Sequence, residues 1–277
     1  MKVTSPSLRL ACFAIAATVG LALSSSAQAQ KVLVDLGQNS SFRGVTVPTP
    51  DANGNHWNSV TPGALVTGLV DTTGASTAFN LGWDTPVGTD SFNGASGGAT
   101  TFPNPTPSEI ATADSKLNKP ALGDLGIAEA AIDYAASPGG ANNNTLFDLE
   151  NLDPTKTYTL KLFGSHVFSN DQQTTYTAGT GFDATLFTIT GVEASASIDV
   201  DEIDTNDPSL PPNIPNGSQV ATLSGLTPNS GGVLFVDFIG KTGNIGYLNS
   251  FELLVPEPTG LAMFALAGTF IARRRRH

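Results

Sequence analysis

Apolar and polar residues alternate with a period of two in several short segments of this chain. The clearest segment is 158–162, in which Tyr158, Leu160 and Leu162 share one face. The Asp- and Pro-containing segment 153–156 comes directly before it. A period of two is typical of a half-buried β-strand, and a proline fixes the backbone of a preceding turn. The pattern therefore predicts a turn followed by a strand.

Further strands are expected between residues 30 and 254. The run 233–239 is apolar on both faces, which indicates a central strand. In 247–254, Phe251 and Leu253 share one face. The remaining strands are expected at 31–36, 64–69, 76–83, 145–149 and 219–223, and at 184–190 paired with 194–200 across Gly191.

Helix is expected to be scarce in a chain with 29 Gly and 18 Pro among its 277 residues. Ser108 is expected to cap a turn that begins at Glu109. The segment 124–134 has apolar residues at near-helical spacing. About ten strands with little helix predict an all-β fold, a β-sandwich or jelly roll with long loops.

The first 29 residues have the three parts of a secretory signal peptide. Lys2 and Arg9 form a basic start, 10–23 is apolar, and 27–29 (Ala-Gln-Ala) fits the small-x-small cleavage pattern. We expect export by the Sec machinery and a cut by signal peptidase after Ala29. An uncleaved N-terminal anchor is the alternative. The sequence thus divides into a leader at 1–29, a body at 30–254 and a tail at 255–277.

The tail is a second signal. Pro256, Glu257 and Pro258 precede the uncharged run 259–272, and a basic cluster follows it: Arg273, Arg274, Arg275 and Arg276. As a helix the run would span roughly 21 Å. This is a short transmembrane helix whose arginines would stay in the cytoplasm. The prolines would stop the helix outside the bilayer and leave an extended peptide open to a protease.

Charge and cysteine content narrow the classes of function. The formal net charge is −11. Without the leader and the tail, the body at 30–254 has 7 basic residues and 23 acidic ones, a charge of −16. So acidic a body repels nucleic acid and attracts divalent cations. The only cysteine, Cys12, lies in the leader, so the mature chain would have no thiol nucleophile and no disulfide.

The tail resembles the PEP-CTERM sorting signal, which exosortases of Gram-negative bacteria recognise. The matching parts are Pro256-Glu257-Pro258, the apolar run and the terminal arginines, in that order at the end of the chain. The resemblance implies that an exosortase cleaves near the Pro-Glu-Pro and releases or transfers the body. An ordinary short membrane anchor is the alternative. In either case these residues perform no chemistry themselves.

The body resembles β-sandwich domains common in planctomycete and verrucomicrobial surface proteins, which are similar to galactose-binding-like jelly rolls. The match rests on 147–154, 158–165, 174–177 and 246–249. In those domains an arginine often follows the Phe-Gly-Ser and another precedes the Thr-Thr-Tyr. Here His166 and Gln173 stand at these positions. The departure puts ligand binding through those arginines in doubt.

Catalysis has few candidates. No H-E-x-x-H helix or P-loop is present. Glu129 and Asp133 lie one helical turn apart and would pair as the carboxylates of a glycosidase, although solvated surface acids are the simpler interpretation. We expect no enzyme activity.

Two kinds of binding site have candidates. Hard oxygens at short intervals suit Ca²⁺, and a set on one loop is Asp199, Asp201, Asp204 and Asp207. Asp35 and the acid-amide segment 51–55 are weaker variants, and a solvated acidic loop is the alternative. For polysaccharide, exposed rings and amides are the usual ligands, and the candidates are Trp57, Asn58 and Tyr176, with His56 and Trp83. Trp57 is expected to be exposed because its neighbours are polar.

The sequence favours an exported, non-enzymatic protein, anchored in the inner membrane in transit and then placed at the cell surface or outside the cell. Its body would bind glycan. A structural or adhesive matrix component is the second hypothesis, and a polysaccharide hydrolase the third.

Overall fold

The computed structural model describes residues 30–38, 44–85, 87–90, 105–138, 144–166, 173–200, 216–241 and 244–255. These residues belong to one compact unit. Leader residues 1–29 and tail residues 256–277 lie outside the described part of the chain.

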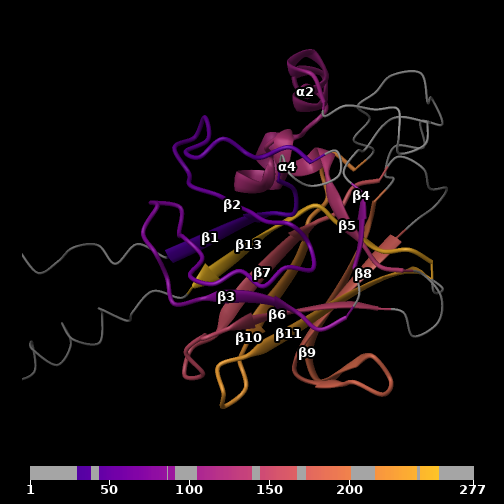
Figure 1. The fold of residues 1–277 in the computed structure, drawn as a ribbon. Helices are drawn as coiled ribbons and strands as arrows, with labels where there is room; N and C mark the ends of the chain where they lie inside the picture. Colours follow the sequence, from indigo (N-terminus) through magenta and orange to yellow (C-terminus); the bar gives the residue numbers. More distant parts are fainter. Residues whose placement is uncertain are drawn as a thin grey trace, which may run out of the picture. The chain divides into compact units, whose positions relative to one another are not determined.

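Sheet A has five strands in the order β10-β7-β13-β1-β2. All neighbours are antiparallel except β1 and β2, which pair through two residues of each strand. Figure 1 shows β1, β13 and β7 side by side. The strands span Gln30–Asp35 (β1), Asn58–Ser59 (β2), Tyr158–Phe163 (β7), Ala221–Leu226 (β10) and Ser250–Val255 (β13).

Sheet B also has five strands, in the order β3-β6-β11-β8-β9, and every pair is antiparallel. Its strands span Asn80–Trp83 (β3), Thr145–Glu150 (β6), Gln173–Asp183 (β8), Thr188–Asp199 (β9) and Leu234–Gly240 (β11). A small third sheet joins Gly88–Asp90 (β4), Tyr134–Ala136 (β5) and Tyr247–Leu248 (β12).

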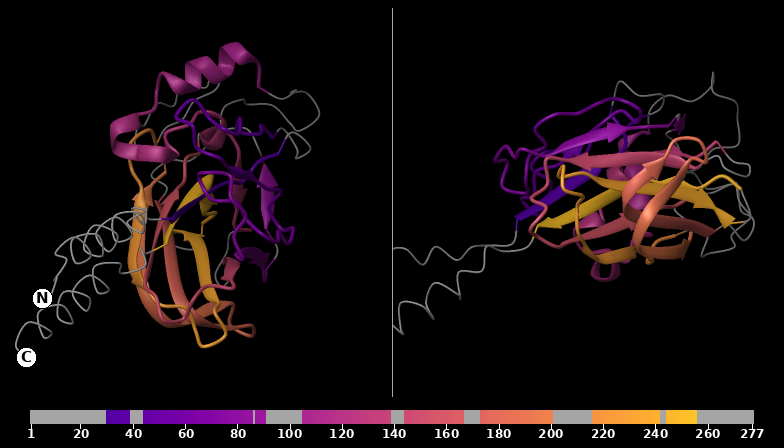
Figure 2. Two further views of the ribbon diagram at one scale, coloured as in Figure 1. Left: turned by 90° about the vertical axis from the view of Figure 1, so that its left-hand side faces the viewer. Right: turned by 90° about the horizontal axis from the view of Figure 1, so that it is seen from below.

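The main core lies between sheets A and B, which pack face to face (Figure 2). Leu160 and Leu253 of sheet A and Phe147 and Val236 of sheet B belong to the same buried cluster. The stacked rings of Phe147 and Phe251 join the two layers, with their centroids 5.4 Å apart. The fold is therefore all-β, with a sandwich-like pair of sheets, as the sequence predicted.

A second core covers the other face of sheet A. Leu33 of β1 and Phe163 of β7 project from that face and pack with Trp57, Leu125 and Ile132. Sheet A is therefore buried on both faces where these segments cover it. The covering helices span Pro107–Asp114 (α2), Lys119–Leu122 (α3), Gly123–Leu125 (η1) and Glu129–Ile132 (α4).

The helical segments differ from the prediction in detail. Thr106, not Ser108, caps α2, and it forms a capping box with Glu109. The predicted helix over 124–134 is divided into η1 and α4, and Tyr134 already belongs to β5. Gly126 follows η1 in a non-helical conformation, which interrupts the segment.

Several predicted strands are confirmed. The strands at 31–36, 145–149, 158–162 and 233–239 correspond to β1, β6, β7 and β11. β11 is the middle strand of sheet B, as its apolar character indicated. The predicted strand 247–254 is interrupted at Asn249, between β12 and β13.

Other predicted strands are wrong. In 64–69 only Val66 forms a bridge, to Leu81, and 76–83 is regular only over β3. The pairing across Gly191 does not occur. The chain reverses at 184–187, and Gly191 lies inside β9, next to Val192, which pairs with Gly179 where the register of β8 and β9 shifts. Gly191 has φ of 59°, a conformation that glycine adopts readily.

Candidate functional site

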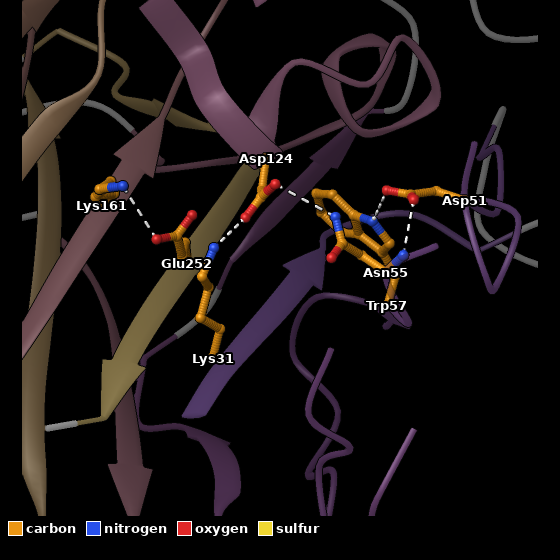
Figure 3. Close-up of polar contacts among 7 residues, drawn as sticks. All are labelled: Lys31, Asp51, Asn55, Trp57, Asp124, Lys161 and Glu252. Carbon is orange, nitrogen blue, oxygen red and sulfur yellow. Dashed lines mark hydrogen bonds and ion pairs between the residues drawn. The ribbon is translucent and has the colours of Figure 1, made fainter. Parts of the chain in front are cut away.

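A line of polar contacts crosses the outer face of sheet A, beneath the covering segments (Figure 3). Lys161 and Glu252 are opposite one another on β7 and β13, and their side chains form an ion pair of 3.0 Å. The Glu252 side chain is 2% exposed, whereas that of Lys161 is 34% exposed. The lysine thus compensates a carboxylate that the second core has removed from water.

The same face carries a second series of contacts, which ties β1 to the covering loops. Lys31 forms an ion pair with Asp124 of η1, and the Asp124 carboxylate also accepts the side-chain amide of Asn55. The hydrogen bond that Lys31 donates to Asp124 raises the pKa of Lys31. Asp51 accepts the backbone N–H of Asn55 and, at 2.9 Å, the indole N–H of Trp57. These contacts hold the cover in place.

The expected exposure of Trp57 is wrong. The residue is 4% exposed and belongs to the second core, and its one polar atom is bonded to Asp51. Neighbouring Asn58 donates to the carbonyls of Leu33 and Val70 and accepts the N–H of Val70. Asn58 therefore acts as a bridge between loop and sheet, and neither residue offers an exposed ligand-binding surface.

The remaining ring candidates also have structural contacts. Tyr176 is fully buried between the sheets, and its hydroxyl donates to the carbonyl of Tyr247. Trp83 packs partly buried against the main core and contacts Phe147. His56 lies beside Thr49, with Nδ1 3.2 Å from the threonine hydroxyl. The four ring residues do not form one exposed platform.

The structure brings two carboxyl groups together where the sequence did not predict a pair. Asp35 ends β1 and Asp133 follows α4, and both are fully buried. Asp35 Oδ2 accepts the hydroxyl of Ser59 and the N–H of Val47. Asp133 Oδ2 accepts the N–H of Val45 at 2.7 Å. The chain from Val45 to Val47 thus presents two alternate N–H groups to the two acids.

Burial dominates the electrostatics of this pair. Desolvation raises the pKa of Asp133 to about 8 and raises that of Asp35 well above its usual range, with a further rise from the charge of Asp133. Glu129 adds negative potential at both. The interpretation of Asp133 as a solvated surface acid is wrong, because the side chain lies inside the protein.

Sheet B holds two further buried acids, Asp148 on β6 and Asp237 on β11. Burial raises the pKa of each to about 6. Asp148 is also affected by the charges of Asp84 and Glu150, whereas Asp237 accepts a hydrogen bond from Asn144.

His166, which stands where the resemblance expects an arginine, is buried in an aromatic cluster. Its ring lies parallel to that of Tyr247, with centroids 3.9 Å apart, and Tyr134 meets both rings edge-on. Desolvation lowers the pKa of His166 to about 3. The residue is therefore neutral at ordinary pH and cannot supply the positive charge of an arginine.

The acid-amide segment 51–55 is a closed turn. The N–H of Asp51 donates to the carbonyl of Asn55, and Asp51 Oδ1 accepts the N–H groups of Asn53 and Asn55. The same bonds recur in 71–75 and 229–233, where the first residues are Asp71 and Asn229. Protein N–H groups occupy the oxygens, so this segment does not have the arrangement of a calcium loop. The shared sequence is Asp/Asn-x-x-Gly-x, with glycine at positive φ.

The predicted calcium loop is only partly described. Asp199 ends β9, and its N–H donates to the side chain of Gln219. Asp201, Asp204 and Asp207 lie outside the described residues. Within the described ranges, no group of three or more His, Cys, Asp and Glu side chains has the arrangement of a metal site.

Polar residues inside apolar strands are the signal that sequence reasoning missed. Asp35 interrupts Val-Leu-Val-Asp-Leu, and Ser250 and Glu252 interrupt the apolar last strand. All three are buried. A charge in a strand that is apolar on both faces usually has a buried partner.

No family model matches this chain, and no curated protein or solved structure was found to be similar to it. The sorting residues Pro256, Glu257, Pro258 and Arg273 to Arg276 lie outside the described residues. In the part of the chain that the structure describes, no helix is long and apolar enough to cross a membrane.

Proposed function

We propose that this chain is an exported, non-enzymatic cell-surface or extracellular-matrix protein that an exosortase sorts and processes through its tail. The order of Pro-Glu-Pro, apolar run and arginines supports the sorting role. The galactose-binding-like resemblance and the sandwich-like sheets support a structural or ligand-presenting body.

The observation that carries the proposal is the pairing of the first and last strands. Gln30 of β1 is directly opposite Val255 of β13, and the ladder is continuous from there to the Asp35–Ser250 pair. The expected signal-peptidase cut falls immediately before this ladder, and the Pro-Glu-Pro begins immediately after it. Two cuts at these places would remove the leader and tail and leave every hydrogen bond of the terminal strands intact.

The same pairing restricts where a processing enzyme can act. β13 lies between β7 and β1, and its residues are paired on one or both sides as far as Val255. A protease needs an extended, unpaired substrate, so a cut inside β13 would require local unfolding. The scissile bond of a folded substrate therefore lies after Val255, which agrees with a signal that starts at Pro256.

The body is proposed to act by its structure, as a matrix component, with glycan binding as a second role. Burial of Trp57 and Tyr176 leaves glycan binding without the rings first assigned to it. The hydrolase hypothesis has no support from Asp133, because Val45 occupies one oxygen of that buried carboxyl group. The structural role needs neither a ring platform nor an exposed carboxyl pair.

Intact-mass analysis in the native host tests the proposal. The wild-type body should begin at Gln30 and end after Val255. Glu257→Ala, and a variant with Arg273 to Arg276 changed to Ala, should retain the tail and stay in the inner membrane. Glu193→Ala, an exposed change in β9, is the matched control and should be processed normally. Identical cleavage sites and identical localisation for all four proteins would rule out sorting by the tail.

A further inference from the structure

Three buried oxygen atoms near the end of β1 have no hydrogen-bond partner. They are Oδ1 of Asp35, Oδ1 of Asp133 and Oγ of Ser250, and all three residues are fully buried. An unsatisfied buried polar group costs about 1–3 kcal/mol, and more when it is charged. Three such groups in one region need a common explanation.

The fold places these residues close to one another. Asp35 and Ser250 are direct partners in the antiparallel pairing of β1 with β13, so their side chains share the face of sheet A that the helices cover. The Asp133 carboxyl group packs against Gly37, two residues beyond Asp35. It fills the space of a side chain at that position: a Cβ on Gly37 would be 1.6 Å from Asp133 Oδ2.

Among the described residues, no positively charged group acts on the two acids. The charged groups that act on Asp35 are Asp133 and Glu129, and the one that raises the pKa of Asp133 is Glu129. All are acidic. Burying two carboxylates without a cation costs several kcal/mol for each, so the pair must bind protons or a positive ion.

Proton sharing does not satisfy the free oxygens. The charge of Asp133 acts on Asp35, but no hydrogen bond joins the two carboxyl groups within the described residues. Two separate carboxylic acids would each bury an O–H group, and the hydroxyl of Ser250 would remain without a partner. A cation between the groups would satisfy all three oxygens at once.

We propose that Asp35, Asp133 and Ser250 form a buried binding site for a hard, oxygen-seeking cation, and that this cation is Ca²⁺. The donor set contains only oxygen, with no histidine or sulfur, which is the preference of Ca²⁺. Ca²⁺ also accepts backbone carbonyls and water, so two carboxylates are a sufficient acidic component. The bound ion would connect β1, β13 and the end of α4.

Metal content and thermal unfolding of the full chain in detergent test this site. After dialysis against CaCl₂, elemental analysis should find about one Ca²⁺ per chain bound at this site. Saturating CaCl₂ should raise the Tm of the EDTA-treated chain by about 5–10 °C. Asp35→Asn and Asp133→Asn should abolish the rise, and MgCl₂ should produce a much smaller one. NaCl at matched ionic strength controls for screening.

Two further variants keep the test decisive. Ser250→Ala removes one neutral oxygen, so it should leave the Tm in EDTA unchanged or higher and increase the half-saturating CaCl₂ concentration several-fold. Asp201→Asn with Asp204→Asn changes the acidic loop that the sequence suggested and should retain the rise. Absence of both bound Ca²⁺ and the rise overturns the proposal. Loss of the rise in the loop variant, with retention in Asp35→Asn, overturns it as well.

Discussion

The carboxylate of Asp133 accepts the backbone N–H of Val45 at 2.7 Å, although 88 residues separate them in the sequence. This bond joins the end of α4 to the segment that follows β1. Val47 makes the corresponding bond to Asp35. The pair of acids therefore holds the 45–47 segment against sheet A, and its charge state should influence the stability of the body.

The first prediction concerns pH. The pKa of Asp133 is about 8 in the folded chain and 3.8 as a reference value, so the folded state holds a proton that the unfolded state has lost. The free energy of unfolding should therefore fall as pH rises from about 4 to about 8. In EDTA, the difference between wild type and Asp133→Asn should shift by about 2–5 kcal/mol over this range. Urea unfolding at several pH values measures it.

The burial of His166 changes the free energy of unfolding in the opposite direction with pH, so His166 serves as the control for that series. Its folded pKa is about 3, against 6.5 as reference, so its contribution to stability is lost as pH falls from about 6.5 to about 3. His166→Phe should remove this acid-side loss and leave the alkaline decline unchanged. A wild-type stability that is flat from pH 4 to 8, with no change in Asp133→Asn, would contradict the assignment.

The second prediction is that Gly37→Ala destabilises the body through Asp133. The new Cβ would overlap the carboxyl group, so one of them must move, at a cost of about 1–3 kcal/mol. The cost should be smaller in an Asp133→Ala background, where the space is free. Gly231→Ala is the control, because its Cβ would meet only the side chain of Asn229, at 3.2 Å. Equal costs in both backgrounds would refute the contact.

The third prediction concerns Lys161. Lys161→Met should destabilise the body by about 1–3 kcal/mol, because it leaves the buried Glu252 without its partner. In a Glu252→Gln background the same change should cost less than about 1 kcal/mol. Lys119→Met removes an exposed pair with Asp114 and should cost about 0.5 kcal/mol or less. Chemical denaturation of the four variants and the wild type gives this double-mutant cycle.

The fourth prediction concerns the end of the body. A chain of residues 30–255 should fold with a Tm close to that of the full chain, because β13 is complete at Val255. A chain that ends at Glu252 loses Leu253, a fully buried core residue, and should be destabilised by at least about 3 kcal/mol. Circular dichroism of the two proteins compares them. Failure of the longer chain to fold would show that the leader or the tail contributes to the stability of the body.

Local sequence patterns were sufficient to predict the strands whose burial follows from the main core alone. The alternation of Tyr158, Leu160 and Leu162 was sufficient for β7, because its inner face meets the main core. The apolar run at 233–239 was sufficient for the central position of β11. In both cases the order of apolar and polar residues within the strand itself predicts which side chains are buried.

Local sequence patterns were misleading where segments distant in the sequence cover a residue and decide its burial. Ser250 and Glu252 alternate with apolar residues, a pattern typical of a half-buried strand, but a second layer covers that face and buries both. Trp57 was expected to be exposed among polar neighbours, but Asp51 accepts its indole N–H and the ring enters the second core. Residues far away in the chain create these environments, so a window of local sequence does not contain them.

The adjacency of Gln30 and Val255 has a practical consequence for engineering. A short glycine-rich linker should join these two positions without disturbing the sheet, and new ends could then be opened at the exposed reversal of 184–187, between β8 and β9. In a circularly permuted body of this kind, the leader and the tail would be attached at the new ends and no longer beside β1 and β13.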